Sequence, residues 1–253
     1  SVNRKQYERI GRILLGIAAD DESKPFLTAA YELYQKFPLE KYTYLEKELP
    51  QDMNVIKSVL AETPGKGSVV ELGSGLGRVT NRLAEEIAES IIGVEILDEY
   101  INKARQRDKS GRVDYRRADW KNTGLDPGSV KLTLSLGRSL NAADEKELEE
   151  IAKEVKRIGG KFLFSYADRE SPKYQNDIRA YAEVLSNISP ELNKRMSAKG
   201  AKDQYDVIIS SSDGIHVSHR YIYKKVYLEY IFSKAGMKLT EVKREPIPGL
   251  EGA

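Results

Sequence analysis

Residues 68–79 read SVVELGSGLGRV, and this stretch decides the fold. The first five residues are typical of a short buried strand. The glycines at 73, 75 and 77 predict a tight turn, and a helix is expected to begin near Arg78. A glycine-rich turn between a strand and a helix lets backbone N–H groups approach a bound ligand closely. The stretch therefore predicts a strand, a ligand-binding loop and a helix in direct succession.

The alternation of strands and helices continues on the carboxyl side of this stretch. Short β-rich runs occur at 68–72, 91–95, 113–117, 129–136 and 161–166, with amphipathic helical patterns between them. Such alternation implies right-handed crossovers and a mostly parallel sheet with helices on both faces. The predicted fold class is therefore α/β, a Rossmann-like doubly wound sheet.

The flanking segments predict accessory structure. Helical patterns precede the Pro64-Gly65 break, so residues 1–65 are predicted to form an N-terminal helical lid or accessory region. Residues 66–253 are predicted to form the ligand-binding domain, with a substrate-side insertion at about 170–224. Runs at 205–211 and 215–223 are expected to pair through a hairpin at Asp213-Gly214, and a last strand is expected near 237–243.

Composition narrows the function classes. The 253 residues include no cysteine, which excludes a disulfide framework and any cysteine-ligated metal site. The net charge is +2 with 32% charged residues, so there is no global reason to expect a polyanionic partner. No apolar run reaches the length of a membrane span, and the first residues lack a signal-peptide core. We therefore expect a soluble, cytoplasmic protein without a metal site or a membrane partner.

The glycine spacing and one carboxylate discriminate between two kinds of ligand. A dinucleotide-binding loop has the pattern G-x-G-x-x-G, and that register would put Arg78 where the third glycine belongs. Glu71 ends the strand, and a carboxylate repels a pyrophosphate but attracts a sulfonium or ammonium group. Both observations favour a cationic cofactor.

At these residues the chain resembles the class I S-adenosylmethionine-dependent methyltransferases, whose first motif is acid-x-Gly-x-Gly-x-Gly. Glu95, 20 residues past Gly75, matches the acid that ends the second strand in that family, and Asp119 matches the acid after its third strand. The resemblance covers about 66–168 and 225–243. It implies a seven-stranded-type sheet and S-adenosylmethionine as the cofactor, with S-adenosylhomocysteine as the product.

The resemblance also implies a set of cofactor-binding residues. In the family the second acid accepts both ribose hydroxyls and the third holds the adenine amino group, while an aromatic residue can pack on adenine. The residues predicted to bind the cofactor are Glu71, Gly73, Ser74, Gly75, Gly77, Glu95, Ile96, Asp119, Trp120 and Leu136. Taken singly, each acid also fits a strand end, a helix cap or an ordinary loop position, and Trp120 also fits a core or rim position.

Candidate catalytic residues are Arg138, Tyr166 and His216. Arg138 follows the fourth strand, where it can hold a substrate carboxylate or phosphate, although an ion-pair role is slightly favoured. Tyr166 follows the fifth strand and can orient an amine or hydroxyl, with a simple strand-end role as an equal alternative. His216 can act as a base near neutral pH, although structural or surface histidines are commoner. It lies three residues from His219 on a predicted strand, so the two should face opposite ways and share no metal.

The predicted function is methyl transfer from S-adenosylmethionine to a nitrogen or oxygen nucleophile of a small molecule. The alternatives are an RNA or protein substrate, a non-catalytic S-adenosylmethionine-binding regulatory domain and, more remotely, aminopropyl transfer. The basic residues between 103 and 117 are diluted by acids and favour a solvated helix face over an RNA surface. No Asn-Pro-Pro-Tyr motif follows the fourth strand, which argues against a nucleobase amine as the acceptor.

Overall fold

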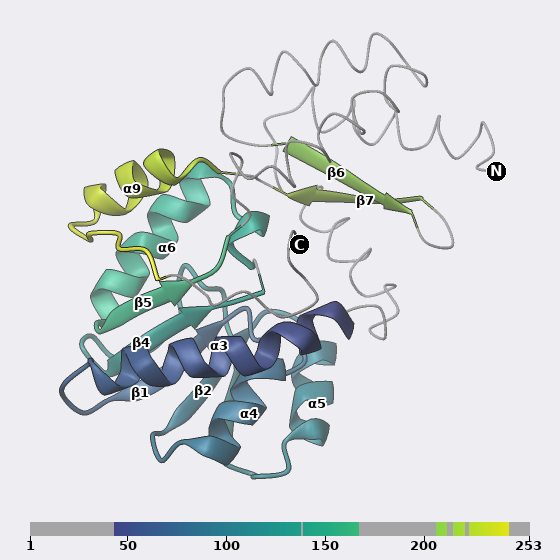
Figure 1. Ribbon diagram of the computed structural model, residues 1–253, viewed down its shortest axis with the longest axis vertical. Helices are drawn as coiled ribbons and strands as arrows, with labels where there is room; N and C mark the ends of the chain where they lie inside the picture. Colours follow the sequence, from purple (N-terminus) through teal and green to yellow (C-terminus); the bar gives the residue numbers. More distant parts are fainter. Residues whose placement is uncertain (1–42, 138, 167–205, 212–214, 221–222, 243–253) are drawn as a thin grey trace, which may run out of the picture. The chain divides into compact units, whose positions relative to one another are not determined.

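The computed structural model describes residues 43–137, 139–166, 206–211, 215–220 and 223–242 (Figure 1). The chain divides into two compact units. One, the sheet unit, comprises Glu40–Tyr166 and Lys225–Ala253, and the other, the hairpin unit, comprises Ser1–Leu39 and Ala167–Lys224. The boundaries proposed for a lid at 1–65 and an insertion at 170–224 stay a prediction.

The sheet unit is built on five parallel strands. They are β1 (Ser68–Leu72), β2 (Ile91–Glu95), β3 (Val113–Arg117), β4 (Val130–Ser135) and β5 (Lys161–Phe164), in the order β3-β2-β1-β4-β5. The order reverses between β1 and β4, which is where open α/β sheets bind ligands. The predicted α/β class is confirmed, and β1, β2 and β3 have the bounds that the sequence predicted.

Helices cover both faces of this sheet (Figure 1). They are α3 (Thr43–Ala61), α4 (Arg78–Glu86), α5 (Asp98–Arg107), the 3-10 helix η2 (Ser139–Ala142), α6 (Glu145–Ile158) and α9 (Lys225–Lys234). Apolar side chains of α3 and α4 share one core cluster with Val69 of β1 and Leu134 of β4. On the opposite face, the Phe162 and Phe164 rings lie 5.7 and 5.2 Å from the Phe232 ring of α9. The sheet is therefore doubly wound.

One row of aligned residues crosses the sheet near the carboxyl ends of its strands, where the candidate site lies. The strand register aligns Tyr115, Gly93, Glu71, Leu134 and Leu163 on neighbouring strands. Residues aligned in this way point to one face, since side chains alternate along a strand. The row therefore brings one carboxyl and one phenol together under the helices of the α3 and α4 face.

The strands after residue 200 differ from the prediction in one respect. β6 (Asp206–Ser211) and β7 (Ile215–Arg220) pair antiparallel in the hairpin unit, as expected, while the turn at 213–214 lies outside the described residues. The strand predicted near 237–243 is wrong over 237–242, which form no strand. Half-buried and exposed positions still alternate from Met237 to Thr240, but alternation makes a strand only where a neighbouring edge accepts its hydrogen bonds. Within the described residues no helix is long and apolar enough to cross a membrane.

Candidate functional site

The glycine loop follows β1 at the carboxyl edge of the sheet. Gly73, Gly75 and Gly77 have φ of +69°, +54° and +77°, in the left-handed region that favours glycine. The N–H groups of Gly73 and Ser74 donate to the carbonyl of Val94, at 2.9 and 3.0 Å. The loop is therefore folded over the end of β2, with its backbone close to the switch point of the sheet.

Tyr115 of β3 explains two of the glycines near this loop. Its ring lies so close over Gly93 that a Cβ there would be 2.6 Å from Tyr115 Cε1, and a Cβ on Gly77 would collide with the Tyr115 hydroxyl. The hydroxyl donates to Asn81 Oδ1 of α4 at 2.6 Å. Burial, helped by the charge of Glu71, raises the pKa of Tyr115, so the phenol stays protonated. Tyr115 thus supports the loop and the first turn of α4 from below.

Glu71 lies beneath the loop. It is 4% exposed, and its carboxyl oxygen accepts a hydrogen bond from the Thr80 hydroxyl of α4. Burial raises the pKa of Glu71 to about 7; the Thr80 hydrogen bond and the Arg78 charge act in the opposite direction, while the Asp52 charge adds to the rise. Glu71 therefore changes its charge close to neutral pH.

Glu95 ties the glycine loop to the start of α5. Its Oε2 accepts the N–H of Gly75 at 2.9 Å, and its Oε1 accepts the N–H groups of Ile96 and Leu97 at 2.8 and 3.1 Å. Burial raises the pKa of Glu95, and the three backbone hydrogen bonds oppose that rise. Ile96, a predicted site residue, thus contributes its backbone to the carboxylate. Two carboxylate oxygens offer about four acceptor positions, so further donors can still bind.

Trp120 and the 3-10 helix η2 both lie close to the first glycine of the loop. A Cβ on Gly73 would lie 3.3 Å from Ser139 Cβ and 3.9 Å from the Trp120 ring. Leu136, 6% exposed, belongs to the core cluster below. Among the described residues, the hydroxyls of Ser74 and Ser135 are buried without a hydrogen-bond partner. Buried polar groups of this kind call for an explanation, and a ligand is one.

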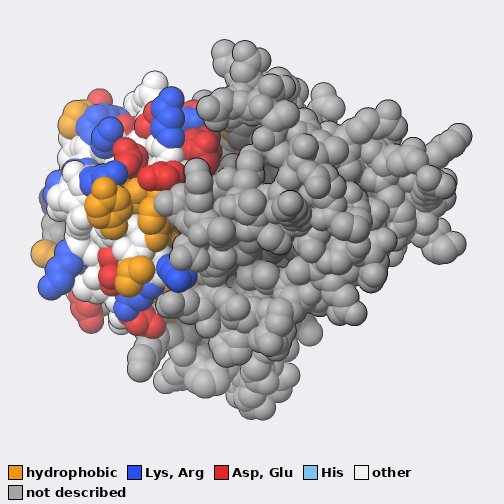
Figure 2. All heavy atoms as spheres, turned by 90° about the horizontal axis from the view of Figure 1, so that it is seen from above, with side chains coloured by type: hydrophobic (Ala, Val, Ile, Leu, Met, Phe, Trp, Pro, Cys, Tyr) orange, Lys and Arg blue, Asp and Glu red, His pale blue; other side chains and the backbone are white. Residues whose placement is uncertain are grey.

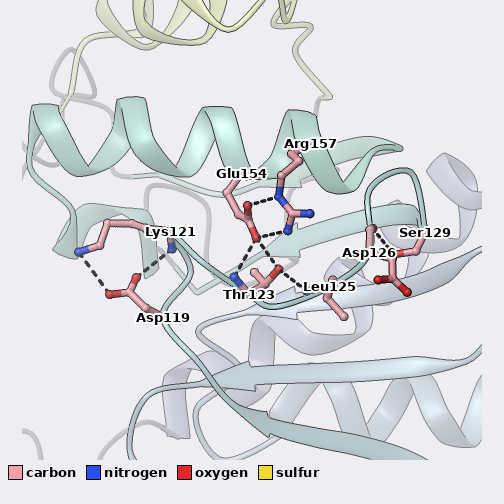
Figure 3. Close-up of polar contacts among 8 residues, drawn as sticks. All are labelled: Asp119, Lys121, Thr123, Leu125, Asp126, Ser129, Glu154 and Arg157. Carbon is pink, nitrogen blue, oxygen red and sulfur yellow. Dashed lines mark hydrogen bonds and ion pairs between the residues drawn. The ribbon is translucent and has the colours of Figure 1, made fainter.

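Asp119 stands at the open edge of the site. Its Oδ1 accepts the N–H of Lys121 at 2.8 Å, its Oδ2 lies 3.3 Å from Lys121 Nζ, and its side chain is 37% exposed (Figure 3). The carboxylate is therefore oriented by its own turn and retains acceptor capacity towards solvent. It comes directly before Trp120, which lies close to the glycine loop.

Sequence reasoning missed a buried ion pair at this site. Arg78, the first residue of α4, lies 2.9 Å from Asp52 of α3, with side chains 14% and 0% exposed. The pair joins the helix before the sheet to the end of the glycine loop. The position of Arg78 directly after the loop was visible in the sequence, but no local pattern pointed to a partner 26 residues away.

The three candidate catalytic residues have different outcomes. Tyr166 is half-buried directly after β5, with its ring 6.1 Å from that of Phe164. Arg138 lies outside the described residues. His216 and His219 both lie in β7 of the hairpin unit, for which the structure describes the backbone and not the side chains. No cluster of three or more His, Asp or Glu able to hold a metal occurs in the described ranges.

The fold and this site define a class of protein, and comparisons with known proteins agree. Residues 69–159 match the sequence model of a family described as a methyltransferase domain. No curated protein matches the chain in a sequence search. The match spans β1 from its second residue, β2, β3, β4, the glycine loop and the three predicted cofactor acids, Glu71, Glu95 and Asp119.

Solved structures share the fold. A S-adenosylmethionine-dependent methyltransferase from Thermotoga maritima aligns with 20% identity and a TM-score of 0.51, covering 82% of this chain and 80% of its own. One from Leishmania major aligns with 12% identity and a TM-score of 0.61, over 88% and 78%. Magnesium protoporphyrin IX methyltransferase from Synechocystis, with S-adenosylhomocysteine bound, aligns with 13% identity and a TM-score of 0.54, over 87% and 89%.

The predicted resemblance to the class I S-adenosylmethionine-dependent methyltransferases is thereby confirmed over residues 69–159, which form a methyltransferase domain. This domain makes the protein an enzyme and supports S-adenosylmethionine as its cofactor. The site fits that cofactor. The loop has no side chain at its three glycines, and the Glu95 carboxylate is buried beside it. The Ser74 and Ser135 hydroxyls, which have no hydrogen-bond partner among the described residues, lie at the ends of neighbouring strands.

Proposed function

We propose that the enzyme transfers a methyl group from S-adenosylmethionine to a nitrogen or oxygen nucleophile of a small molecule. The attacking lone pair forms the new bond to the methyl carbon, the carbon–sulfur bond breaks, and the sulfur leaves as the neutral thioether of S-adenosylhomocysteine. The methyl group is already activated, so the protein mainly supplies alignment and removes water. A base is needed only where the nucleophile arrives protonated.

In this proposal the cofactor lies across the carboxyl edge of β1, β2 and the segment after β3. The left-handed glycines let the loop backbone approach the amino-acid part of the cofactor. Glu95 accepts the ribose hydroxyls, and the hydrogen bond that it accepts from Gly75 N holds its carboxylate against the loop. Asp119 accepts the adenine amino group, and Trp120 packs against the base.

The roles on the acceptor side are proposed from chemistry alone. Tyr166 orients the incoming amine or hydroxyl from the end of β5, next to the carboxyl edge. Arg138 holds a carboxylate or phosphate of the acceptor, and His216 takes up the proton that the nucleophile loses.

One observation favours a small acceptor over RNA: most of the basic residues around α5 and β3 are already engaged. Lys103 pairs with Glu99, Arg116 with Asp114 and Arg117 with Asp98. Arg105 and Arg112 donate to backbone carbonyls of the sheet unit. RNA phosphates would have to displace these partners, which weakens the electrostatic attraction that drives nucleic-acid binding. Figure 2, a view from above Figure 1, shows that basic and acidic side chains are also interspersed on the described part of the face it presents.

The test is to follow the methyl group. The enzyme is incubated with S-adenosylmethionine carrying a labelled methyl and with fractionated cell extract, and the label is traced in metabolites, RNA and protein. Label in a small-molecule fraction is expected. Label in RNA or protein would replace the proposed substrate class, and no transfer to any fraction, despite measured cofactor binding, would favour a regulatory domain. A Glu95→Ala enzyme serves as the control for transfer that depends on the site.

A further inference from the structure

The segment between β3 and β4 runs along α6, and its attachments to that helix follow one another in order. Lys121 Nζ lies 3.0 Å from Glu147 Oε1 in the first turn of α6. Two residues later, Thr123 donates twice to Glu154 Oε1, from its N–H at 2.8 Å and from its hydroxyl at 2.6 Å. Gly128 N then donates to the carbonyl of Arg157 at 3.1 Å, near the end of the helix. The segment is thus held along the whole length of α6.

The middle attachment is the most buried of the three. Thr123 is 3% exposed, and the Glu154 side chain is 6% exposed. Arg157 donates to both Glu154 oxygens, at 2.7 and 2.8 Å (Figure 3). These hydrogen bonds lower the pKa of Glu154 to about 2, and the one from Arg157 has the largest effect. The carboxylate is therefore ionised at any working pH. Charge-assisted bonds of this kind are the strong ones, and a buried acceptor is costly to leave unpaired.

The first attachment lies next to the residues assigned to adenine. Lys121 bridges Glu147 and Asp119, with its Nζ 3.3 Å from Asp119 Oδ2. Trp120 stands between Asp119 and Lys121 in the chain. Glu147 is itself held, because it forms a reciprocal capping box with Asp144 at the start of α6. The turn that carries Asp119 and Trp120 is therefore attached through Lys121 to α6, a helix outside the two strands that this segment connects.

We propose that Glu147 and Glu154 of α6 are positioning residues that hold Asp119 and Trp120 where they recognise the adenine of the cofactor. This inference rests on the proposed function, which assigns Asp119 to the adenine amino group. The expected consequence is that loss of either glutamate charge weakens recognition of adenine without removing any group that touches the cofactor.

The chain provides its own reporter, because Trp120 is its only tryptophan. The test compares Glu147→Gln and Glu154→Gln with Glu150→Gln, a matched charge loss on the same helix but outside both attachments. Acrylamide quenching of tryptophan fluorescence measures the accessibility of Trp120 directly. Calorimetric titration with S-adenosylhomocysteine and with S-inosylhomocysteine, which carries a carbonyl in place of the adenine amino group, measures the preference for adenine.

Both test variants are expected to increase quenching of Trp120 and to reduce the preference for adenine by about threefold to tenfold, the equivalent of one weakened hydrogen bond. The Glu150→Gln control should match the wild type in both. Equal loss of affinity for both ligands would indicate a purely structural role and overturn the proposal, as would unchanged quenching and preference in the folded variants. If Glu154→Gln does not fold, the test rests on Glu147→Gln. This variant is expected to fold, because a glutamine side chain can still accept the hydrogen bond of the capping box.

An Asp119→Asn variant separates the two ideas. If it lowers the adenine preference while the α6 variants do not, the adenine assignment stands and the positioning role is refuted. If Asp119→Asn leaves the preference unchanged, the adenine role of Asp119 is refuted, and quenching of Trp120 alone then decides whether α6 holds the segment.

Discussion

Replacing Glu71 by glutamine should change how the stability of the protein depends on pH. The pKa of Glu71 is raised to about 7 from an ordinary value of 4.5, chiefly by burial. Between these two values the folded protein holds a proton that the unfolded chain has released. Its stability therefore falls as the pH rises through this window, and the full cost is present above pH 7. At about 1.4 kcal/mol per unit of pKa shift, that cost is about 3 kcal/mol at pH 8.

Glutamine has no charge to bury and retains an acceptor for the Thr80 hydroxyl. Urea unfolding of both proteins at pH 5, 6, 7 and 8 should therefore show the free energies of unfolding diverging, with the variant gaining up to about 3 kcal/mol by pH 8. Other titrating groups cancel in the difference between the two proteins. The exposed Glu62→Gln serves as the control, and its curve should run parallel to the wild type. Parallel curves for Glu71→Gln as well would refute the burial of a titrating carboxyl under the loop.

Three further predictions concern the same unit. Glu95→Ala should weaken binding of S-adenosylmethionine by roughly 1.5–3 kcal/mol through lost charge-assisted hydrogen bonds; calorimetry measures this, and an unchanged affinity would contradict the ribose assignment. Gly93→Ala should destabilise the fold by about 1–3 kcal/mol, because its Cβ would overlap the Tyr115 ring; urea unfolding tests this, and full stability would mean that the ring can move aside. Arg112→Ala should cost about 1 kcal/mol, since its guanidinium donates to four carbonyls at the end of α4, with distances from 2.7 to 3.3 Å. Arg107→Ala, a nearby exposed arginine, is the comparison for Arg112 and should unfold at the wild-type urea midpoint.

Local patterns were sufficient for the elements around the glycine loop. The runs at 68–72, 91–95 and 113–117 are short and contain β-branched or aromatic residues, and their limits agree with β1, β2 and β3. The same pattern reasoning failed at 237–242. A strand exists only with a hydrogen-bonding neighbour, and alternation along one segment says nothing about that neighbour.

By itself, the sequence determined the α/β class and the loop at 73–77, and it predicted a cationic cofactor, because glycine spacing and one adjacent carboxylate are local properties. Only the tertiary structure decided what those residues do for one another. Parallel register brings Tyr115 over Gly93 and beside Glu71, helix packing pairs Asp52 with Arg78, and α6 holds the segment that carries Asp119. These contacts join residues far apart in the chain, and their geometry follows from strand order and core packing, for which no single stretch of sequence carries a signal.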